Sequence, residues 1–254
     1  MRRLFENKVA LVTGGGSGIG RASALAFARE GASVVVHYNT NVKGAEETVK
    51  IIREAGGNAI SIQAHVEKAA EVEAMVNKTI ETYSQLDCAF NNAGVPASGK
   101  RTADCSEEDW DRIININLKG VWLCMKYEIP QMLKQGKGAI VNNSSIAGLV
   151  GQQKRPAYIA SKHGVVGLTK AAALDYIKDN IRVNAVCPAG IVTPILERVF
   201  ARGPGWKEEM LHDVPMGRFG MPEEVAEVVV WLCSDAASFI TGHALPVDGG
   251  WVAR

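Results

Sequence analysis

Residues 8–20 read KVALVTGGGSGIG, an apolar run followed by a glycine-rich turn. The run 9–12 has the length and β-branched content of a buried strand, and the stretch that begins near Gly18 has the apolar spacing of a helix. A strand that leads through glycines into a helix leaves backbone N–H groups unpaired, and these attract an anion together with the helix dipole. The segment therefore predicts the first strand–helix unit of a parallel sheet, with an anion site at its turn.

The same alternation of short apolar runs and longer amphipathic stretches continues along the whole chain. It predicts a single α/β domain over residues 1–254, in which helices flank both faces of a doubly wound, seven-stranded parallel sheet. The expected strands are 9–12, 33–38, 59–63, 88–91, 139–143, 182–187 and 244–247. The expected helices are 18–30, 42–55, 69–83, 107–134, 156–178 and 222–234.

Composition excludes several classes of protein. The chain has 28 Lys+Arg and 27 Asp+Glu, which gives a formal charge of +1 and no basic excess for nucleic acid. Its five cysteines are scattered and form no CxxC pair, which argues against a disulfide framework or a zinc site and favours a reducing compartment. No apolar segment has the length of a signal-peptide core or of a membrane span. We therefore expect a cytoplasmic protein with no membrane or nucleic-acid partner.

One region departs from this alternation. Residues 188–215 contain four prolines and three glycines, with only a short helical patch near residues 195–201. Long irregular segments in compact domains are commonly lids or binding loops. The segment predicts a loop that covers a substrate, and an ordinary surface insertion is the alternative.

Tyr158 and Lys162 form a candidate proton-transfer pair. They are four residues apart in the expected helix 156–178, so they share one helix face. A phenol with a pKa of about 10 exchanges protons poorly at neutral pH, and a nearby cation lowers that pKa. The same spacing also occurs in ordinary solvated pairs, so these two residues alone do not decide the function.

Seven motifs, taken together and in order, give the chain a resemblance to the short-chain dehydrogenases/reductases that covers essentially its whole length. They are the glycine-rich turn at 13–20, Asn-Asn-Ala-Gly at 91–94, Asn117, Ser144-Ser145, Tyr158-x-x-x-Lys162, Pro188-Ala189-Gly190 and Asp248-Gly249-Gly250. The resemblance implies a Rossmann-type domain and an enzyme that moves a hydride between a nicotinamide cofactor and a ketone or secondary alcohol.

The resemblance also implies catalytic roles. Tyr158 is the general acid and base, and Lys162 holds the nicotinamide ribose and lowers the phenol pKa. Ser145, thirteen residues before Tyr158, binds the substrate oxygen, whereas its neighbour Ser144 is expected to be structural. Asn117, inside an expected helix that asparagine disfavours, supports a water relay to the lysine.

The resemblance further implies a set of cofactor contacts spread over the chain. These are Gly14, Ser17, Gly18, Ile19, Gly20, Tyr38, Asn39, His65, Val66, Asn91, Ala93, Gly94, Tyr158, Lys162, Pro188, Gly190, Ile191 and Thr193. His65 departs from the family pattern, which commonly has Asp at that position near the adenine. The other histidines at 37, 163, 212 and 243 have no metal-ligand spacing and are expected to be structural, so no metal is predicted.

The sequence leaves the choice between NADP and NAD open, with a preference for NADP. Tyr38 stands where family members that prefer NAD usually have an acidic residue, so no carboxylate there repels a 2′-phosphate. The basic residues typical of NADP enzymes are also missing, because Ser17 and Asn39 occupy those positions. Neutral donors at 39–41, with Lys43 nearby, remain available for a phosphate.

Several alternatives stay open. The substrate is expected to be a small ketone or alcohol, and parts of the chain resemble enzymes of alicyclic alcohols, diols and sugars. The 3-oxoacyl-(acyl-carrier-protein) reductases share nearly every motif, and a cofactor-binding sensor or scaffold without turnover is an alternative of another class. The resemblance implies a homotetramer, and a monomer is the alternative.

Overall fold

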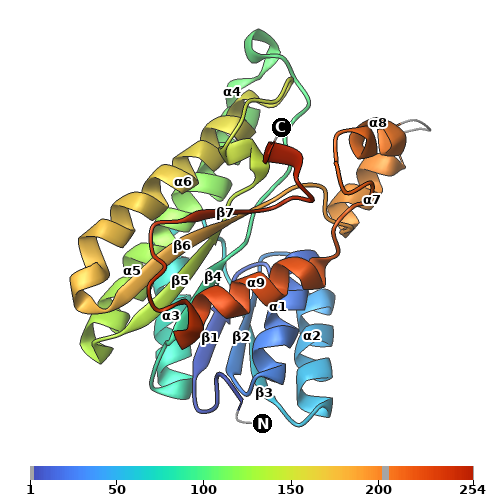
Figure 1. Cartoon of the computed structure of the whole chain (residues 1–254). Helices are drawn as coiled ribbons and strands as arrows, with labels where there is room; N and C mark the ends of the chain where they lie inside the picture. The colour runs from blue at the N-terminus through green and yellow to red at the C-terminus, as the bar shows by residue number, and fades with distance from the viewer. Residues whose placement is uncertain (1–2, 202–205, 254) are drawn as a thin grey trace.

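The computed structural model describes residues 3–201 and 206–253, and all seven strands belong to one parallel sheet in the order β3-β2-β1-β4-β5-β6-β7 (Figure 1). The strands are β1 Val9–Val12, β2 Ser33–Tyr38, β3 Asn58–Gln63, β4 Cys88–Asn91, β5 Gly138–Asn143, β6 Ile181–Pro188 and β7 Ala244–Val247. Each predicted strand is confirmed to within one residue at either end. The doubly wound parallel sheet expected from the sequence is therefore correct.

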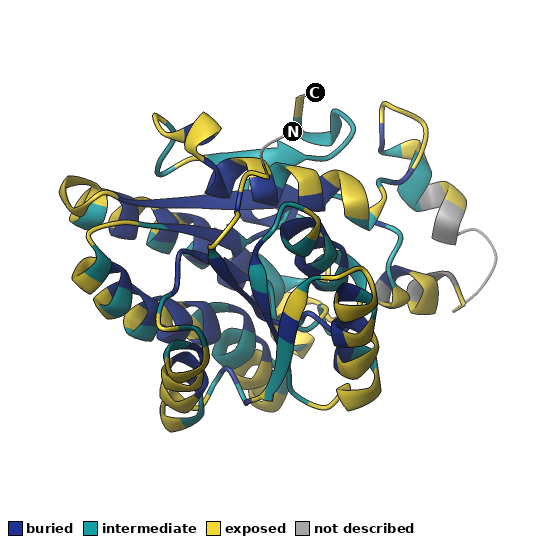
Figure 2. Cartoon of the chain, turned by 90° about the horizontal axis from the view of Figure 1, so that it is seen from below, coloured by how far each residue is buried: buried dark blue, intermediate teal, exposed yellow. Residues whose placement is uncertain are grey.

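Helices cover both faces of the sheet. They are α1 Gly18–Arg29, α2 Val42–Glu54, α3 Ala69–Tyr83, α4 Glu107–Ile114, α5 Gly120–Gln135, α6 Pro156–Tyr176, α7 Pro194–Phe200, α8 Trp206–His212 and α9 Pro222–Cys233. The apolar side chains of α1, α2 and α9 form one core against the sheet, and those of α3, α5 and α6 form the other. Figure 2 shows the buried residues gathered along the sheet and the exposed ones on the outer helix faces.

Strand β1 is apolar throughout because it faces a core on both sides. In β1, Ala10 and Val12 belong to the core under α1 and α9, whereas Leu11 points into the opposite core. Successive strand residues alternate between the two faces, so a strand covered on both faces needs an uninterrupted apolar run. The run VALV was therefore recognisable as a strand, although its apolar residues do not alternate with polar ones.

The single helix expected over residues 107–134 is wrong. The helical path is interrupted by a π-turn at Asn115–Lys119, which separates α4 from α5. Asn117 is fully buried there, and its amide bonds the backbone of Val95 at both ends, at 2.8 and 2.9 Å. The Val95 backbone lies 22 residues away in the chain, so periodicity within the helix gave no sign of this break.

The segment 188–215 is more helical than its prolines suggested. It contains α7 and α8, which pack against each other outside the two helix layers (Figure 1), while residues 202–205 lie outside the described part of the chain. A cavity of about 150 Å³ lies beside it, between Gly190, Met216 and Asp248. Among the described residues, no helix is long and apolar enough to cross a bilayer.

Candidate active site

The predicted site residues gather at the carboxyl ends of the strands. The sheet grows from β1 in two directions: β2 and β3 lie on one side of it, and β4 to β7 lie on the other. The strand order therefore reverses between β1 and β4. In open α/β sheets this reversal opens a crevice at the carboxyl edge, and ligands bind there. The loops after β1, β4, β5 and β6 all end at this edge.

The loop after β1 has the shape of a phosphate cradle. Gly14 has a φ of +67°, which other residues rarely adopt, and a Cβ on Gly20 would overlap the Gly14 carbonyl oxygen. Ser17 precedes α1, and its side chain caps none of the N–H groups of the first turn. These free donors and the close backbone approach fit the pyrophosphate of a dinucleotide.

His37 fixes this loop, a contribution that the sequence did not reveal. Its Nδ1 accepts a hydrogen bond from the Gly14 N–H at 3.1 Å, so Nε2 donates to the Ala64 carbonyl at 2.9 Å. Burial lowers the pKa of His37 to about 4, which keeps the ring neutral and Nδ1 free to accept. A polar residue inside an apolar β-strand was the available signal.

Thr13 and Asn92 link the loops after β1 and β4. The Thr13 hydroxyl accepts from the backbone N–H groups of Asn92 and Ala93 at 2.8 and 3.0 Å. The Asn92 amide donates to the Thr13 carbonyl at 2.9 Å and accepts from Asn143 at the end of β5. Asn92 thus joins the ends of three neighbouring strands, β1, β4 and β5.

The side chain of Asn91, a predicted cofactor contact, lies in the core of the protein. It is 1% exposed, and its amide donates to Glu128 and to Asn142, both at 3.1 Å. The strand alternation turns Asn91 into the core under α5 and leaves the residues after it, Ala93 and Gly94, at the edge. Any contact of Asn91 with a ligand is therefore restricted to its backbone.

The ends of β2 and β3 lie side by side, as a ribose and adenine site requires. The Ala64 N–H donates to the Tyr38 carbonyl at 3.0 Å, and the Gln63 amide donates to the Asn39 carbonyl at 2.9 Å. The Asn39 Oδ1 atom is buried and has no hydrogen-bond partner among the described residues. An unpaired buried oxygen at this edge fits a polar group of a bound nucleotide.

His65 and Val66 follow β3 at the same edge. The His65 ring lies 3.2 Å from a Glu67 carboxylate oxygen, and its backbone N–H donates to Glu71 at 2.7 Å. Val66 is buried against Gly120, where a Cβ would come within 2.9 Å of the valine methyl. The pair lies just after Ala64, whose N–H bonds the Tyr38 carbonyl, and His65 is half exposed; contact of either residue with a cofactor stays a prediction.

The segment after β6 meets the start of α1. A Cβ on Gly18 would lie 3.0 Å from the Thr193 methyl, so the glycine turn and this segment touch. Ile191 forms a bridge with Gly220, and Gly190 packs closely on the Phe219 ring. Two groups of predicted cofactor contacts that are far apart in the chain, around Gly18 and Thr193, therefore lie side by side.

Tyr158 and Ser145 meet at this edge. Burial raises the pKa of Tyr158, whereas a hydrogen bond with the Ser145 hydroxyl and the positive charge of Arg155 lower it. The Ser145 oxygen is held by the Ala147 N–H at 3.1 Å and lies 3.4 Å from the Pro188 carbonyl. The phenol and the hydroxyl are thus positioned to bind the same substrate oxygen.

Lys162 lies behind Tyr158. Its ammonium is 5.6 Å from the centre of the tyrosine ring and donates to the Asn143 carbonyl at 2.8 Å. Burial lowers the pKa of Lys162 to about 8. Ser144, which precedes Ser145, donates to the Lys162 carbonyl at 3.0 Å and so connects β5 to α6.

The amide of Asn117 is hydrogen-bonded to the Val95 backbone, and a water relay from Asn117 to Lys162 stays a prediction.

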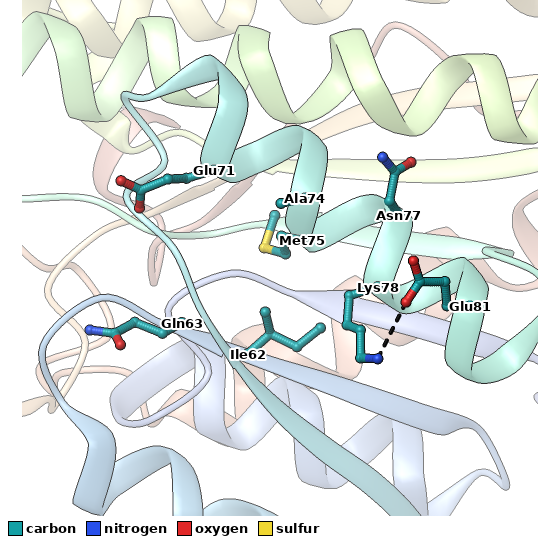
Figure 3. A pocket seen from close by; sticks show the side chains of 8 residues that line it. All are labelled: Ile62, Gln63, Glu71, Ala74, Met75, Asn77, Lys78 and Glu81. Carbon is teal, nitrogen blue, oxygen red and sulfur yellow. Dashed lines mark hydrogen bonds and ion pairs between the residues drawn. The ribbon is translucent and has the colours of Figure 1, made fainter.

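A hollow elsewhere on the molecule does not contribute to this site. It has a volume of about 510 Å³ and lies between the edge strand β3 and α3 (Figure 3). Its charged side chains already pair at the surface, Lys78 with Glu81 at 3.3 Å and Lys68 with Glu71 at 3.0 Å. The crevice at the carboxyl edge is therefore the candidate active site.

Comparison with known proteins agrees with this geometry. Residues 14–252 match the family model described as enoyl-(acyl carrier protein) reductase. The chain is 45% identical over 254 residues to cyclohexanol dehydrogenase of Acinetobacter sp. (strain SE19), covering 100% of this chain and 98% of that protein. It is 42% identical to a 3-oxoacyl-(acyl-carrier-protein) reductase of Staphylococcus aureus (strain Mu50), covering 96% and 97%. The crystal structure of levodione reductase superposes with a TM-score of 0.95 at 36% identity, covering 98% and 99%.

The fold and the site define a dinucleotide-dependent oxidoreductase. The chain belongs to the short-chain dehydrogenase/reductase family. It is an NAD(P)-dependent enzyme that acts on CH–OH groups.

Proposed function

We propose that the enzyme interconverts a ketone and a secondary alcohol, with Tyr158 as general acid and base and NADP(H) as the preferred cofactor. The observation that carries this proposal is the arrangement of Ser145, directly after β5, and of Tyr158 and Lys162 on α6. The Lys162 ammonium lies 5.6 Å from the centre of the tyrosine ring and 2.8 Å from the Asn143 carbonyl oxygen at the end of β5. A bound nicotinamide nucleotide supplies or accepts the hydride.

The protein's own groups handle the substrate oxygen. During reduction Tyr158 gives its proton to the ketone oxygen, and Ser145 donates a hydrogen bond to the same oxygen as negative charge develops there. In the reverse direction the phenolate takes the proton of the alcohol. Burial raises the phenol pKa, so neighbouring donors and cations have to oppose it for proton exchange at neutral pH.

Lys162 supports this chemistry from the adjacent helical turn. With a pKa of about 8 its ammonium stays mostly protonated at neutral pH, and the Asn143 carbonyl fixes its position. We assign it to the ribose of the cofactor, because its ammonium lies between the Tyr158 ring and the end of β5. There its charge also favours the phenolate.

The preference for NADP rests on the end of β2. No carboxylate follows that strand, and Lys43 is exposed in the first turn of α2, next in the chain. Asn41 is not free to bind, because it caps Gly44 and donates to the Gly16 carbonyl. The phosphate of NADP would therefore be met by Asn39, Thr40 and the Lys43 ammonium.

The substrate is proposed to be a small, mainly apolar secondary alcohol or ketone under the segment 188–215. Cyclohexanol dehydrogenase and levodione reductase are named for reactions on such compounds. The 3-oxoacyl-(acyl-carrier-protein) reductase among the relatives makes a carrier-bound oxoacyl group the alternative substrate.

We also propose a cytoplasmic homotetramer. Trp110 and Trp122 are 42% and 44% exposed on α4 and α5, and Leu174 is 79% exposed on α6. Large apolar side chains left in water on adjacent helices commonly mark an interface. Light scattering on the purified protein tests the assembly, and a mass of one chain would contradict it.

Titration with NADPH and NADH tests whether the protein binds a nicotinamide nucleotide, and it requires no known substrate. We expect both to bind with enhanced nicotinamide fluorescence and NADPH to bind more tightly. Tighter binding of NADH would overturn the cofactor preference alone. A folded protein that binds neither would overturn the proposed reaction. Nucleotide binding without turnover of any alcohol or ketone would favour the alternative of a cofactor-binding sensor or scaffold. A screen of alcohols and ketones then follows with the preferred cofactor.

A further inference from the structure

Arg21 and Thr48 hold the glycine-rich loop against α2. Arg21, on α1, donates from Nε to the hydroxyl of Thr48, on α2, at 3.0 Å. Its Nη2 donates to the carbonyl oxygens of Gly16 and Gly44, both at 3.0 Å. The buried Thr48 hydroxyl lies 3.1 Å from the Gly15 carbonyl oxygen and 2.9 Å from that of Gly44. Two successive carbonyl groups of the loop are therefore bound by this pair of side chains.

These contacts set the direction of the N–H groups in the loop. In a trans peptide, the carbonyl of one residue and the N–H of the next point in opposite directions. The Gly15 and Gly16 carbonyls point toward Thr48 and Arg21, so the N–H groups that follow them point away from this pair. These two N–H groups, on Gly16 and Ser17, have no acceptor among the described residues. They are therefore free to bind a ligand.

The close approach of α2 to the loop requires a glycine inside that helix. A Cβ on Gly44 would overlap the Gly16 carbonyl oxygen. Glycine in a helix costs about 1 kcal/mol relative to alanine, so a glycine at this position indicates a packing requirement. The first turn of α2 is thus packed directly on the loop, where Arg21 and Thr48 bind it.

The protein does not neutralise the charge of Arg21. The guanidinium is half-buried, and the acceptors that it contacts are a hydroxyl and two carbonyls, all uncharged. No ion pair joins it to a carboxylate within residues 3–201 and 206–253. The Gly16 carbonyl that it binds belongs to the same peptide group as the Ser17 N–H. An anion bound at that N–H is therefore attracted by a positive charge one peptide group away.

We propose that Arg21 and Thr48 are positioning residues for the diphosphate of the cofactor. They hold the Gly16 and Ser17 N–H groups in the direction that binds the diphosphate, and Arg21 adds an attractive charge behind the loop. This inference rests on the proposed binding of a nicotinamide nucleotide at the glycine cradle. NADPH and NADH both carry the diphosphate, so the role does not depend on which of them is preferred.

Competition by ADP and by adenosine separates the diphosphate from the rest of the nucleotide. Each is titrated against NADPH, whose binding is followed by nicotinamide fluorescence. Thr48→Val keeps the shape of the side chain and removes its hydroxyl, whereas Thr48→Ser keeps the hydroxyl. Arg21→Met removes the guanidinium, whereas Arg21→Lys keeps a charge without the planar fork. The control Arg53→Met removes a guanidinium that bonds the Ala59 carbonyl at 3.0 Å near the other end of α2.

The expected loss is confined to ligands that carry the diphosphate. Thr48→Val and Arg21→Met should weaken ADP and NADPH binding about 10- to 100-fold, the usual strength of hydrogen bonds to charged groups, and leave adenosine binding unchanged. Thr48→Ser should restore most of the affinity for ADP, and Arg21→Lys should restore part of it. Arg53→Met should bind all three ligands as the wild type does.

Two results would overturn the inference. One is an unchanged affinity for ADP in both Thr48→Val and Arg21→Met. The other is an equal loss of ADP and adenosine binding, which indicates a general disturbance of the fold. Circular dichroism verifies folding, and if Arg21→Met does not fold, the comparison of Thr48→Val with Thr48→Ser decides.

Failure of the proposed reaction is seen separately. ADP binding that depends on Arg21 and Thr48, with no ketone or alcohol turned over, would overturn the reaction and support the inference. A wild type that binds neither ADP nor NADPH would overturn both.

Discussion

The buried carboxyl of Glu128 is expected to lower the free energy of unfolding of the enzyme as the pH rises. This α5 residue is fully buried, and its Oε2 accepts from Asn91 at 3.1 Å while Oε1 has no partner among the described residues. No ion pair with a described cation reaches it. Burial raises the pKa of Glu128 to about 7, and the bond from Asn91 opposes this only in part.

The direction of the effect follows from proton linkage. In the unfolded chain the carboxyl has its ordinary pKa of 4.5, so between pH 4.5 and 7 the folded state holds a proton that the unfolded state has released. The contribution of Glu128 to stability is fully present below pH 4.5 and is lost as the pH rises to 7 and beyond. At about 1.4 kcal/mol per pKa unit, the loss above pH 7 is roughly 3 kcal/mol.

Glu128→Gln isolates this contribution because glutamine has a similar shape and does not titrate. Urea unfolding is measured from pH 4.5 to 9 at one protein concentration for the wild type, Glu128→Gln and the control Glu73→Gln, an exposed residue of α3. We expect the free energy of unfolding of the wild type to fall by roughly 3 kcal/mol relative to Glu128→Gln across this range. The control should stay parallel to the wild type.

Two results would refute this reasoning. Parallel curves for the wild type and Glu128→Gln would mean that the carboxyl titrates alike in both states, and hence that it is hydrated in the folded enzyme. A free energy of unfolding of the wild type that rises with pH relative to Glu128→Gln would mean that the folded state prefers the ionised form. A constant offset between the two curves would not matter, because the new amide changes local hydrogen bonding at every pH.

Three further substitutions test the site. Tyr158→Phe should keep cofactor affinity within about twofold and lower kcat at least about 100-fold, which is the usual contribution of acid–base catalysis. An unchanged kcat on a verified substrate would exclude the role of Tyr158 in proton transfer. Tyr38→Asp should shift the NADP/NAD affinity ratio about tenfold toward NAD, because a carboxylate repels the phosphate, and an unchanged ratio would mean that the ribose lies elsewhere. His37→Leu leaves the partly buried Gly14 N–H without its acceptor. Urea unfolding should therefore show a loss of about 1–3 kcal/mol and NADPH titration a weaker affinity. An unaltered affinity would show that the loop holds its shape without the imidazole.

The strands and most helix limits were predictable because they depend on local patterns. The runs that became β1 and β2 are apolar on both faces, and the predicted helices other than 107–134 end within two residues of the observed ones. The spacing of Tyr158 and Lys162 on α6 is also local, since four residues make about one helical turn. These features needed no knowledge of distant contacts.

The sequence by itself thus determined the parallel sheet, the glycine cradle and the pair on α6. Only the tertiary structure decided where buried polar side chains point. Asn91 turns into the core toward Glu128, Asn117 breaks a helix to bond Val95, and His37 reaches back to Gly14. Each of these partners lies 22 to 37 residues away. Hydrogen bonds over such separations depend on how whole elements pack, and no periodicity in the chain encodes them.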